Sequence, residues 1–222
     1  MFRKHPHTKL EALEGTTRLE TFSDAVIAIV MTILILEIHV PEIETITNRG
    51  AIEALIPILP KLLSFLVSFV TVAIFWVNHH HFFHPIHKSD GALLWYNNHL
   101  LFWLTVIPFA TAFIGDYPQI PLVVALYGFV LFMGALAFTL MEHHVFFKSH
   151  LLPDSIPLSA RKIQFRRTLV GVGCYGMATG TAFLHPTIAL VIFMIIPLYF
   201  FIPQRVELKE KQTNESTPIS TP

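Results

Sequence analysis

The feature that most constrains this chain is a series of long stretches without charge. The longest, residues 168–204, holds 37 residues and no Asp, Glu, Lys or Arg. A helix needs roughly 20 mostly apolar residues to cross the hydrocarbon of a bilayer, so this stretch is too long for one crossing and suits two short ones. His185 and Pro186 mark the expected break, because proline ends or kinks a helix and histidine favours the membrane interface.

Further apolar stretches precede this one, at residues 22–38, 62–83, 91–115 and 117–141. They are long and continuously apolar, whereas the strands of membrane barrels alternate in polarity and last about 10 residues. The sequence therefore predicts an all-α polytopic membrane protein with six transmembrane helices per subunit. The composition, 53% hydrophobic and 14% charged, agrees with a surface that faces lipid rather than water.

The domain organisation follows from where the apolar stretches stop. Residues 1–203 are expected to form a single transmembrane domain. Residues 204–222 are polar, contain proline and offer nothing to bury, so we expect a disordered cytoplasmic tail. Glutamates precede the first apolar stretch, which argues against a cleaved signal peptide.

The distribution of Lys and Arg predicts the orientation in the membrane. With six crossings both termini lie on one side, and thirteen of the fifteen Lys and Arg residues fall on that side. The two exceptions are Arg49 and Lys61. Since Lys and Arg concentrate in cytoplasmic loops, both termini are predicted to be cytoplasmic.

Other classes of site find little support. The formal net charge is zero, which gives no support for nucleic-acid binding. Cys174 is the single cysteine, so an intrachain disulfide and a zinc site of several thiolates are excluded. His80 and His84 lie one helical turn apart and could share a metal, but Asp90 is the only carboxylate nearby. We therefore expect neither metal nor cofactor and favour histidines that hydrogen-bond locally.

Polar residues at membrane depth are costly and point to a function or to a partner. Arg18 and Asp24 are six residues apart on the first span and do not share one face well, so each is expected to meet another helix. The second span ends, and the third begins, at the same depth. The expected network comprises Arg18, Ser23, Asp24, Trp76, His79 or His80, and Asn97. We favour a role in fixing helix packing, with gating or proton sensing as the alternative.

These residues also carry a resemblance. Arg18-x-x-x-Phe22-Ser23-Asp24, followed by an apolar helix to Leu36, resembles the RxxxFSD signature of the endolysosomal potassium channel family. Further matches are Phe75-Trp76, Asn97 and the Pro108-Phe-Ala-Thr111 segment. The single-repeat form of the chain is similar to prokaryotic members, which implies a plasma-membrane location.

The resemblance implies a six-helix unit whose first helix lines a central pore, and a homotetramer in the membrane lipid. It implies a channel for monovalent cations, potassium above all, without a TVGYG-type carbonyl filter. By position, the pore constriction maps to Ile29, with a further apolar layer at Leu36. The selectivity layer maps to Thr32 and Ile33. Phe22 joins the polar residues of the signature as part of the structural network.

The spacing of these residues agrees with that expectation. Ile29, Thr32, Ile33 and Leu36 follow the pattern i, i+3, i+4, i+7 and so share one helix face. Four copies would form stacked rings, and a narrow isoleucine ring can exclude water and gate by dewetting. The Thr32 hydroxyl would meet an ion that has lost part of its hydration shell. Plain helix packing is the other explanation of an apolar stripe.

Two other functions would draw on some of the same residues. A proton-coupled secondary transporter would use Asp24 and the His79/His80 pair, but transporters usually show paired repeats and broken helices near the midplane. A membrane hydrolase would need Ser and His at one depth or an HExxH motif, and Ser23 already belongs to the channel-like signature. The sequence favours a channel over a transporter and over an enzyme.

Overall fold

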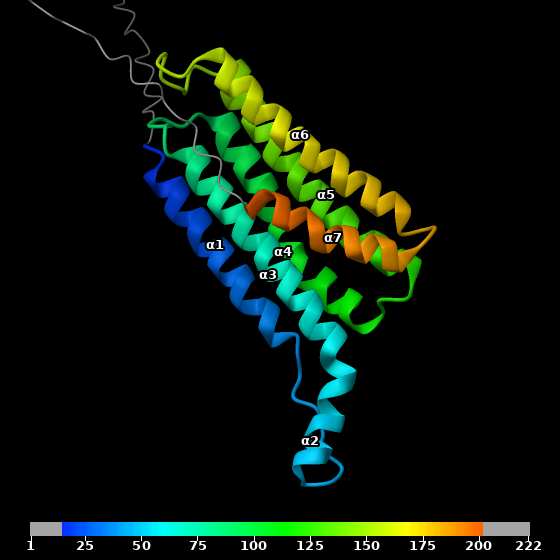
Figure 1. The fold of residues 1–222 in the computed structure, drawn as a ribbon. Coiled ribbons are helices and arrows are strands. Elements are labelled where there is room, and N and C mark those ends of the chain that lie inside the picture. The colour runs from blue at the N-terminus through cyan, green and yellow to red at the C-terminus, as the bar shows by residue number, and fades with distance from the viewer. Residues whose placement is uncertain (1–14, 202–222) are drawn as a thin grey trace, which may run out of the picture.

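The computed structural model describes residues 15–201, and across these residues it is helical with no strands (Figure 1). The predicted tail lies outside the described residues. The helices are α1 (Thr17–Leu36), α2 (Asn48–Leu55), η1 (Ile56–Ile58), α3 (Leu59–Phe83), α4 (Gly91–Asp116), α5 (Pro121–His143), the π-helical turn η2 (His144–Lys148), α6 (Leu158–Thr181) and α7 (Pro186–Phe201). The all-α prediction is confirmed.

Six of these helices pack side by side in a bundle, while α2 projects from one end (Figure 1). In the middle of the bundle α4 contacts α1, α3 and α5, and α5 contacts α4, α6 and α7. The first helix lies at the edge, where it packs on α3 and α4. This edge position decides how much of α1 remains available to anything outside the subunit.

The protein is an integral membrane protein by the length and composition of its helices. Within residues 15–201, four helical segments are long and apolar enough to cross a bilayer: α1, residues 48–83, α4, and residues 121–148. Helix α7 is apolar but shorter. Helix α6 opens with Arg161, Lys162, Arg166 and Arg167, and only its second part is continuously apolar.

Most predicted boundaries agree with the structure. The expected break at His185 and Pro186 is confirmed, since α6 ends at Thr181 and α7 begins with Pro186. The start predicted at residue 117 for the fourth span was wrong. Residues 117–120 form a connection, and α5 begins at Pro121, whose fixed φ and missing N–H suit the first position of a helix.

Two further segments differ from the sequence-based expectation. Helix α6 begins at Leu158, ahead of the uncharged stretch that starts at residue 168. Helix α2 was not predicted. Its start is capped by the Thr47 hydroxyl, which accepts the Gly50 N–H at 3.1 Å. An Arg49–Glu53 ion pair of 2.8 Å follows at the i,i+4 spacing that supports short helices.

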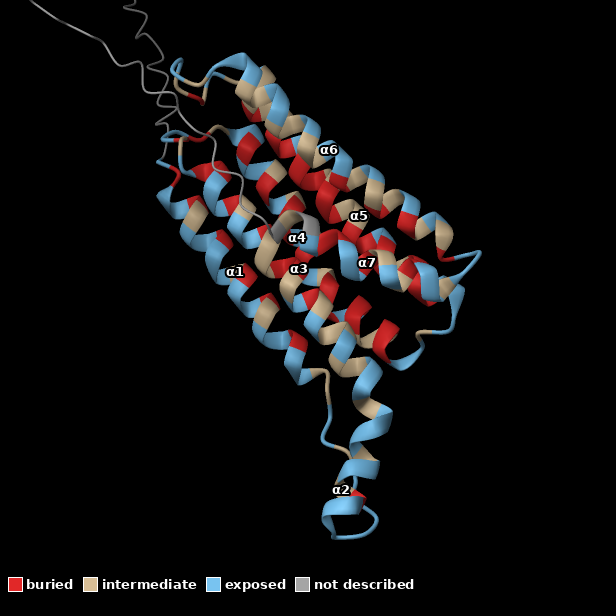
Figure 2. Ribbon diagram, viewed as in Figure 1, coloured by how far each residue is buried: buried red, intermediate tan, exposed pale blue. Residues whose placement is uncertain are grey.

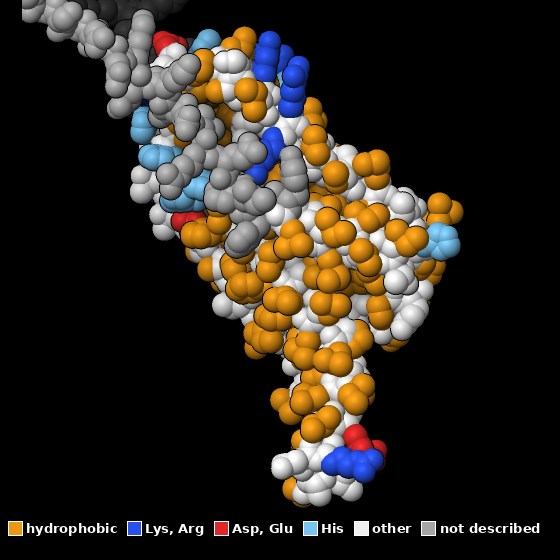
Figure 3. Space-filling view, viewed as in Figure 1, with side chains coloured by type: hydrophobic (Ala, Val, Ile, Leu, Met, Phe, Trp, Pro, Cys, Tyr) orange, Lys and Arg blue, Asp and Glu red, His pale blue; other side chains and the backbone are white. Residues whose placement is uncertain are grey.

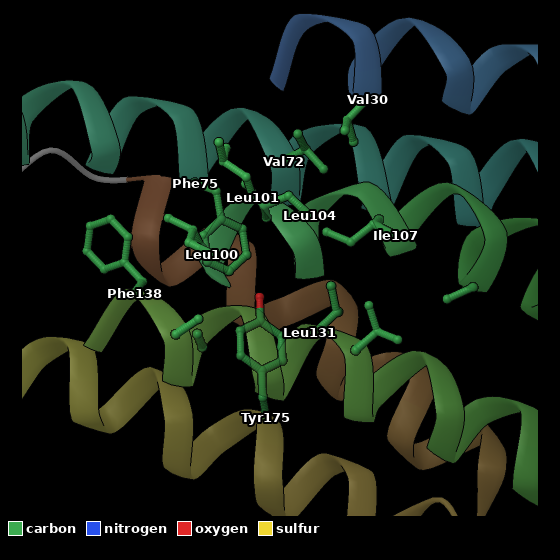
Figure 4. Close-up of a cluster of buried hydrophobic side chains, with 14 of the residues drawn as sticks. Val30, Val72, Phe75, Leu100, Leu101, Leu104, Ile107, Leu131, Phe138 and Tyr175 are labelled. Atoms are coloured by element: carbon green, nitrogen blue, oxygen red, sulfur yellow. The ribbon is translucent and has the colours of Figure 1, made fainter. Parts of the chain in front are cut away.

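Buried residues concentrate where α3, α4, α5 and α6 face one another (Figure 2). Figure 4 shows the centre of this core, where Phe75, Leu104 and Leu131 from three helices converge. Small residues let the helices approach closely. A Cβ added to Gly128 would lie 2.4 Å from Cζ of Phe193 and 2.5 Å from Oγ1 of Thr179.

Polar side chains inside the bundle satisfy one another. The Thr111 hydroxyl donates to Oγ of Ser68 at 2.7 Å, and Oγ of Ser68 lies 2.9 Å from the Tyr127 hydroxyl. Three helices are thereby joined at membrane depth, where an unsatisfied hydroxyl would be costly.

Candidate permeation face and its polar support

Two stripes of side chains divide the surface of α1. The buried stripe anchors the helix to α3 and α4 and consists of Leu19, Ser23, Ile27, Val30 and Leu34. Its members are three or four residues apart, so they lie on one face of the helix. The opposite stripe is left uncovered by the rest of the subunit.

The structure places all four predicted pore residues on the uncovered stripe. Ile29 is 57% exposed, Leu36 is 72% exposed, and Thr32 and Ile33 lie between them, also exposed. The part of this stripe that runs toward α4 is hollowed. A groove of about 320 Å³ is lined by Ile29 and Ile33 on one side and by Pro108 and Phe109 on the other. An apolar face of this extent marks a surface that meets lipid, a pore or another protein chain.

The hydroxyl of Thr32 has a defined orientation. It donates to the backbone carbonyl of Ile29 at 2.8 Å. A hydroxyl has one proton and two lone pairs. Because the proton is committed to the helix backbone, only oxygen lone pairs remain for whatever lies outside α1. This arrangement suits a cation better than an anion.

A buried polar cluster ties α1 to α3 and α4. The Asn97 amide donates from Nδ2 to Oγ of Ser23 at 2.9 Å, and its Oδ1 lies 2.9 Å from Nε2 of His79. All three side chains are at most 1% exposed. Since a carbonyl oxygen only accepts, Nε2 of His79 carries the hydrogen in this arrangement. The cluster holds the start of α1 against the end of α3 and the start of α4.

Asp24 and Trp76 form a second, more exposed group. The Trp76 indole N–H donates to Oδ1 of Asp24 at 2.9 Å, and the indole stacks on the His80 ring with a centroid separation of 6.0 Å. Arg18 and Phe22 lie at the same end of α1, on its exposed side. The expected network residues therefore lie at one end of the bundle, where Ser23, His79 and Asn97 form a buried group and Asp24, Trp76 and His80 an exposed one.

Some polar contacts at this end were not anticipated. Asp90 caps α4 by accepting the Leu93 N–H at 2.7 Å, and its Oδ2 lies 2.9 Å from Nε2 of His144 in the π-helical turn. An Asp directly before an apolar run is an N-cap signal, so the first of these contacts was open to prediction. Within residues 15–201, no three His, Cys, Asp or Glu side chains gather closely enough to hold a metal ion.

Glu142 near the end of α5 was also overlooked. Its side chain is fully buried, and Oε1 accepts from Nε2 of Gln164 at 3.2 Å. No described residue forms a hydrogen bond with Oε2. A single carboxylate in an apolar stretch gives no sequence signal that separates a buried position from one at the interface.

Comparison with known proteins agrees with the geometry. The sequence model of the family described as "Endosomal/lysosomal potassium channel TMEM175" matches residues 18–108. A protein named a potassium channel from Chryseobacterium sp. (strain P1-3) is 37% identical over 201 residues, which cover 88% of this chain and 97% of that protein. The match of residues 18–108 begins at Arg18 and includes α1 and both polar groups.

A solved structure matches the fold. It is described as the crystal structure of a lysosomal potassium-selective channel TMEM175 homolog from Chamaesiphon minutus, with a TM-score of 0.74 and 29% identity. The match covers 84% of this chain and 96% of that chain.

A human relative extends the comparison. It is named an endosomal/lysosomal proton channel TMEM175 and is 25% identical over 196 residues, which cover 85% of this chain but 38% of that longer protein. These relatives are named as ion channels and not as enzymes, in agreement with the sequence-based expectation. The chain belongs to the TMEM175 family.

Proposed function

We propose that this protein is a potassium-permeable cation channel in which α1 of each subunit lines a central pore. The observation that carries the proposal is the uncovered stripe of α1. Ile29, Thr32, Ile33 and Leu36 remain exposed although the opposite side of the same helix is firmly packed. Relatives named as potassium channels support the assignment of the permeant ion.

The chemistry of the stripe suggests how it works. A ring of Ile29 side chains would form a narrow apolar constriction, which excludes bulk water and stays closed to hydrated ions when it is tight. Thr32 would follow one turn along, with oxygen lone pairs facing the ion path. Ile33 and Leu36 would complete the apolar wall toward the outer mouth. The mechanism invokes no cofactor.

A pore of this kind requires several subunits, and we propose a homotetramer. The unit would comprise residues 1–203 with six crossings, formed by α1, α3, α4, α5, α6 and α7, followed by the tail at 204–222. Figure 3 shows Lys and Arg side chains gathered at the end of the bundle where α6 begins. Arg49 in α2 and Lys61 in the first turn of α3 belong to the opposite end. This asymmetry supports cytoplasmic termini in a prokaryotic plasma membrane.

Proton transport is the second candidate. The human relative is named a proton channel, and Asp24 and His80 both contact Trp76 in an exposed polar group near the start of the same helix. A proton-coupled transporter would need this group to alternate between the two sides of the membrane. We favour the channel because the exposed stripe of α1 continues well beyond Asp24 to Leu36.

The proposal is tested by flux measurements in liposomes that contain only this protein. Potassium, sodium and proton gradients are applied separately, and entry of each ion is followed with an ion-sensitive dye. Potassium entry should exceed sodium entry. Ile29→Asn should raise sodium entry toward that of potassium, since a polar ring wets the constriction.

Ile195→Asn on α7 is the matched control, because Ile195 is 56% exposed and Ile29 is 57% exposed. It places the same polar group on the outside of the bundle and should leave the ion preference unchanged. Unaltered flux in Ile29→Asn, with the protein intact, would show that Ile29 forms no constriction. Proton entry without potassium entry would favour the second candidate.

A further inference from the structure

We infer that a cleft between α3, α6 and α7 binds the headgroup of an anionic phospholipid. The cleft has a volume of about 50 Å³ and is open on one side. It lies on the side of α3 that faces away from α1. It shares no lining residue with the groove beside Ile29. Nothing in the proposed permeation path uses it.

The lining of the cleft is amphipathic. Its polar groups at one end come from Asn78 of α3 and from Gln164, Arg167 and Thr168 of α6, and the hydroxyl residues Thr71 and Tyr175 lie further along the same helices. The rest of the lining is mostly apolar, with Phe75, Phe138, Pro197 and Phe200 among its members. A ligand that matches both parts carries an oxyanion at one end and hydrocarbon at the other, as a phospholipid does.

The depth of the polar part is that of a lipid headgroup. Asn78 is adjacent to His79 in α3, and His79 belongs to the polar cluster at the end of the bundle where α1 begins. The cleft continues from there toward Thr71, one or two turns deeper in α3. A phosphate at Arg167 would thus leave the acyl chains to run along the aromatic wall, parallel to the bilayer lipids.

The charge of the cleft mouth selects an anion. Helix α6 carries Arg161, Lys162, Arg166 and Arg167 within seven residues. Arg161 is directed to the preceding loop, where it donates to the carbonyl of Ile156 at 3.1 Å. Arg167 lines the cleft itself, with its guanidinium 5.7 Å from the centroid of the Phe200 ring. Lys162 and Arg166 are exposed on the same turns and add to the positive potential.

The four basic side chains at the start of α6 outnumber the neighbouring carboxylate, which is that of Glu142. Glu142 is fully buried on α5 and accepts from Gln164. It is absent from the cleft lining. Basic pockets between membrane helices on the cytoplasmic side are typical sites for anionic headgroups, and the proposed topology places the start of α6 on that side.

The test uses the purified full-length protein in a neutral detergent. Phosphatidylglycerol or phosphatidylcholine is titrated in, and the shift of the unfolding temperature gives an apparent affinity for each lipid. Phosphatidylglycerol should bind more tightly to the wild type. Arg167→Gln should weaken that binding about fivefold, and Arg167→Lys should largely restore it, since each basic group near the membrane surface contributes by its charge.

Arg49→Gln is the control, because it removes an exposed arginine at the opposite end of the bundle and should not change the preference. A second readout does not depend on the Arg167 variants folding. In Phe200→Trp, the fluorescence of the new tryptophan, after subtraction of the wild-type signal, should be quenched more by phosphatidylglycerol with brominated chains than by the matching phosphatidylcholine.

Three outcomes would overturn the inference. One is an equal phosphatidylglycerol affinity in wild type and Arg167→Gln. Another is equal quenching of Phe200→Trp by the two brominated lipids. The third is the same stabilisation from soluble glycerol phosphate, which would reveal an anion site that has no need of a lipid. Removal of residues 205–222 should leave the preference for phosphatidylglycerol intact. If the truncated protein lost that preference, the tail and not the cleft would form the site.

Discussion

Helices α1 and α5 are similar in apolar character but very different in their surroundings. Of the most apolar 18-residue stretch of each, 67% is buried within the subunit in α5 and 28% in α1. Helix α5 is surrounded by α4, α6 and α7, whereas α1 packs against α3 and α4 along one stripe. Hydropathy thus identifies both as membrane helices, and burial separates the enclosed helix from the one that keeps an exposed face.

The largest effect is expected where α5 is most tightly packed. In Gly128→Ala the new methyl group would meet Phe193 and Thr179 far inside van der Waals distance. Such overpacking costs about 1–3 kcal/mol of unfolding free energy. The measurement is thermal unfolding in detergent.

Gly173→Ala on α6 is the control for this substitution. A Cβ at Gly173 meets nothing within 4 Å, so the protein should keep or gain stability. Equal stability of the two variants would mean that α5 is not the closely packed scaffold described here.

The buried stripe of α1 is expected to be nearly as sensitive. Asn97→Ala leaves the Ser23 hydroxyl and Nε2 of His79 without the amide that they contact. Unsatisfied buried groups destabilise by about 1–3 kcal/mol, toward the lower end in membranes. The unfolding temperature should fall clearly. Asn98→Ala, at the exposed neighbouring position, should leave it nearly unchanged, and a similar fall there would refute the role of the cluster.

The exposed polar group should matter less for stability. Asp24→Asn retains an oxygen that can accept from the Trp76 indole, and both side chains are exposed. The expected loss is below about 1 kcal/mol. Ser23→Ala, one residue earlier and fully buried, should cost more. The reverse order, measured by thermal unfolding of the two variants, would show that Asp24 and not the buried cluster secures α1.

The smallest effect on stability is expected on the exposed stripe itself. Thr32→Ala removes a hydroxyl whose hydrogen bond runs to the backbone of its own helix. The free energy of unfolding should therefore change by no more than about 0.5 kcal/mol, the usual range for surface substitutions. Its effect should show in function, as a lower ratio of potassium to sodium entry into liposomes with conduction retained.

Thr181→Ala on α6 is the matched control for Thr32→Ala. The Thr181 hydroxyl makes the same kind of bond, to the carbonyl of Ala178 at 2.8 Å, and Thr181 does not line the groove beside Ile29. It should leave the ion ratio unchanged. If both substitutions alter the ratio equally, Thr32 has no special place in the ion path.

The sequence predicted much of the fold because a bilayer permits few solutions. Uncharged runs and Pro186 were enough to place α3, α4 and the break before α7. Helix α2 was overlooked because its eight residues form a short capped turn rather than an apolar run. The early start of α6 was overlooked because Arg and Lys lowered its hydropathy, although they are compatible with a helix at the interface.

The sequence predicted the level in the membrane at which the candidate site lies, but not the contacts within it. Ser23, His79 and Asn97 were expected at one level, and the structure brings these three together. Their separation from Asp24 and Trp76 depends on the angular position of each side chain, which the spacing of residues on separate helices does not fix. Glu142 and Arg167 gained their surroundings from α6 and α7, whose packing no local pattern reveals.

The most direct test of the account asks whether the exposed stripe of α1 meets water. In a Cys174→Ala background, which removes the single native cysteine, Thr32→Cys and Ile195→Cys are each reconstituted in liposomes and treated with a charged thiol reagent while potassium entry is recorded. The account predicts that the reagent stops potassium entry in Thr32→Cys and leaves Ile195→Cys unaffected. A Thr32→Cys protein that stays unlabelled and conducts as before would contradict it, because α1 would then face lipid and not a conduit.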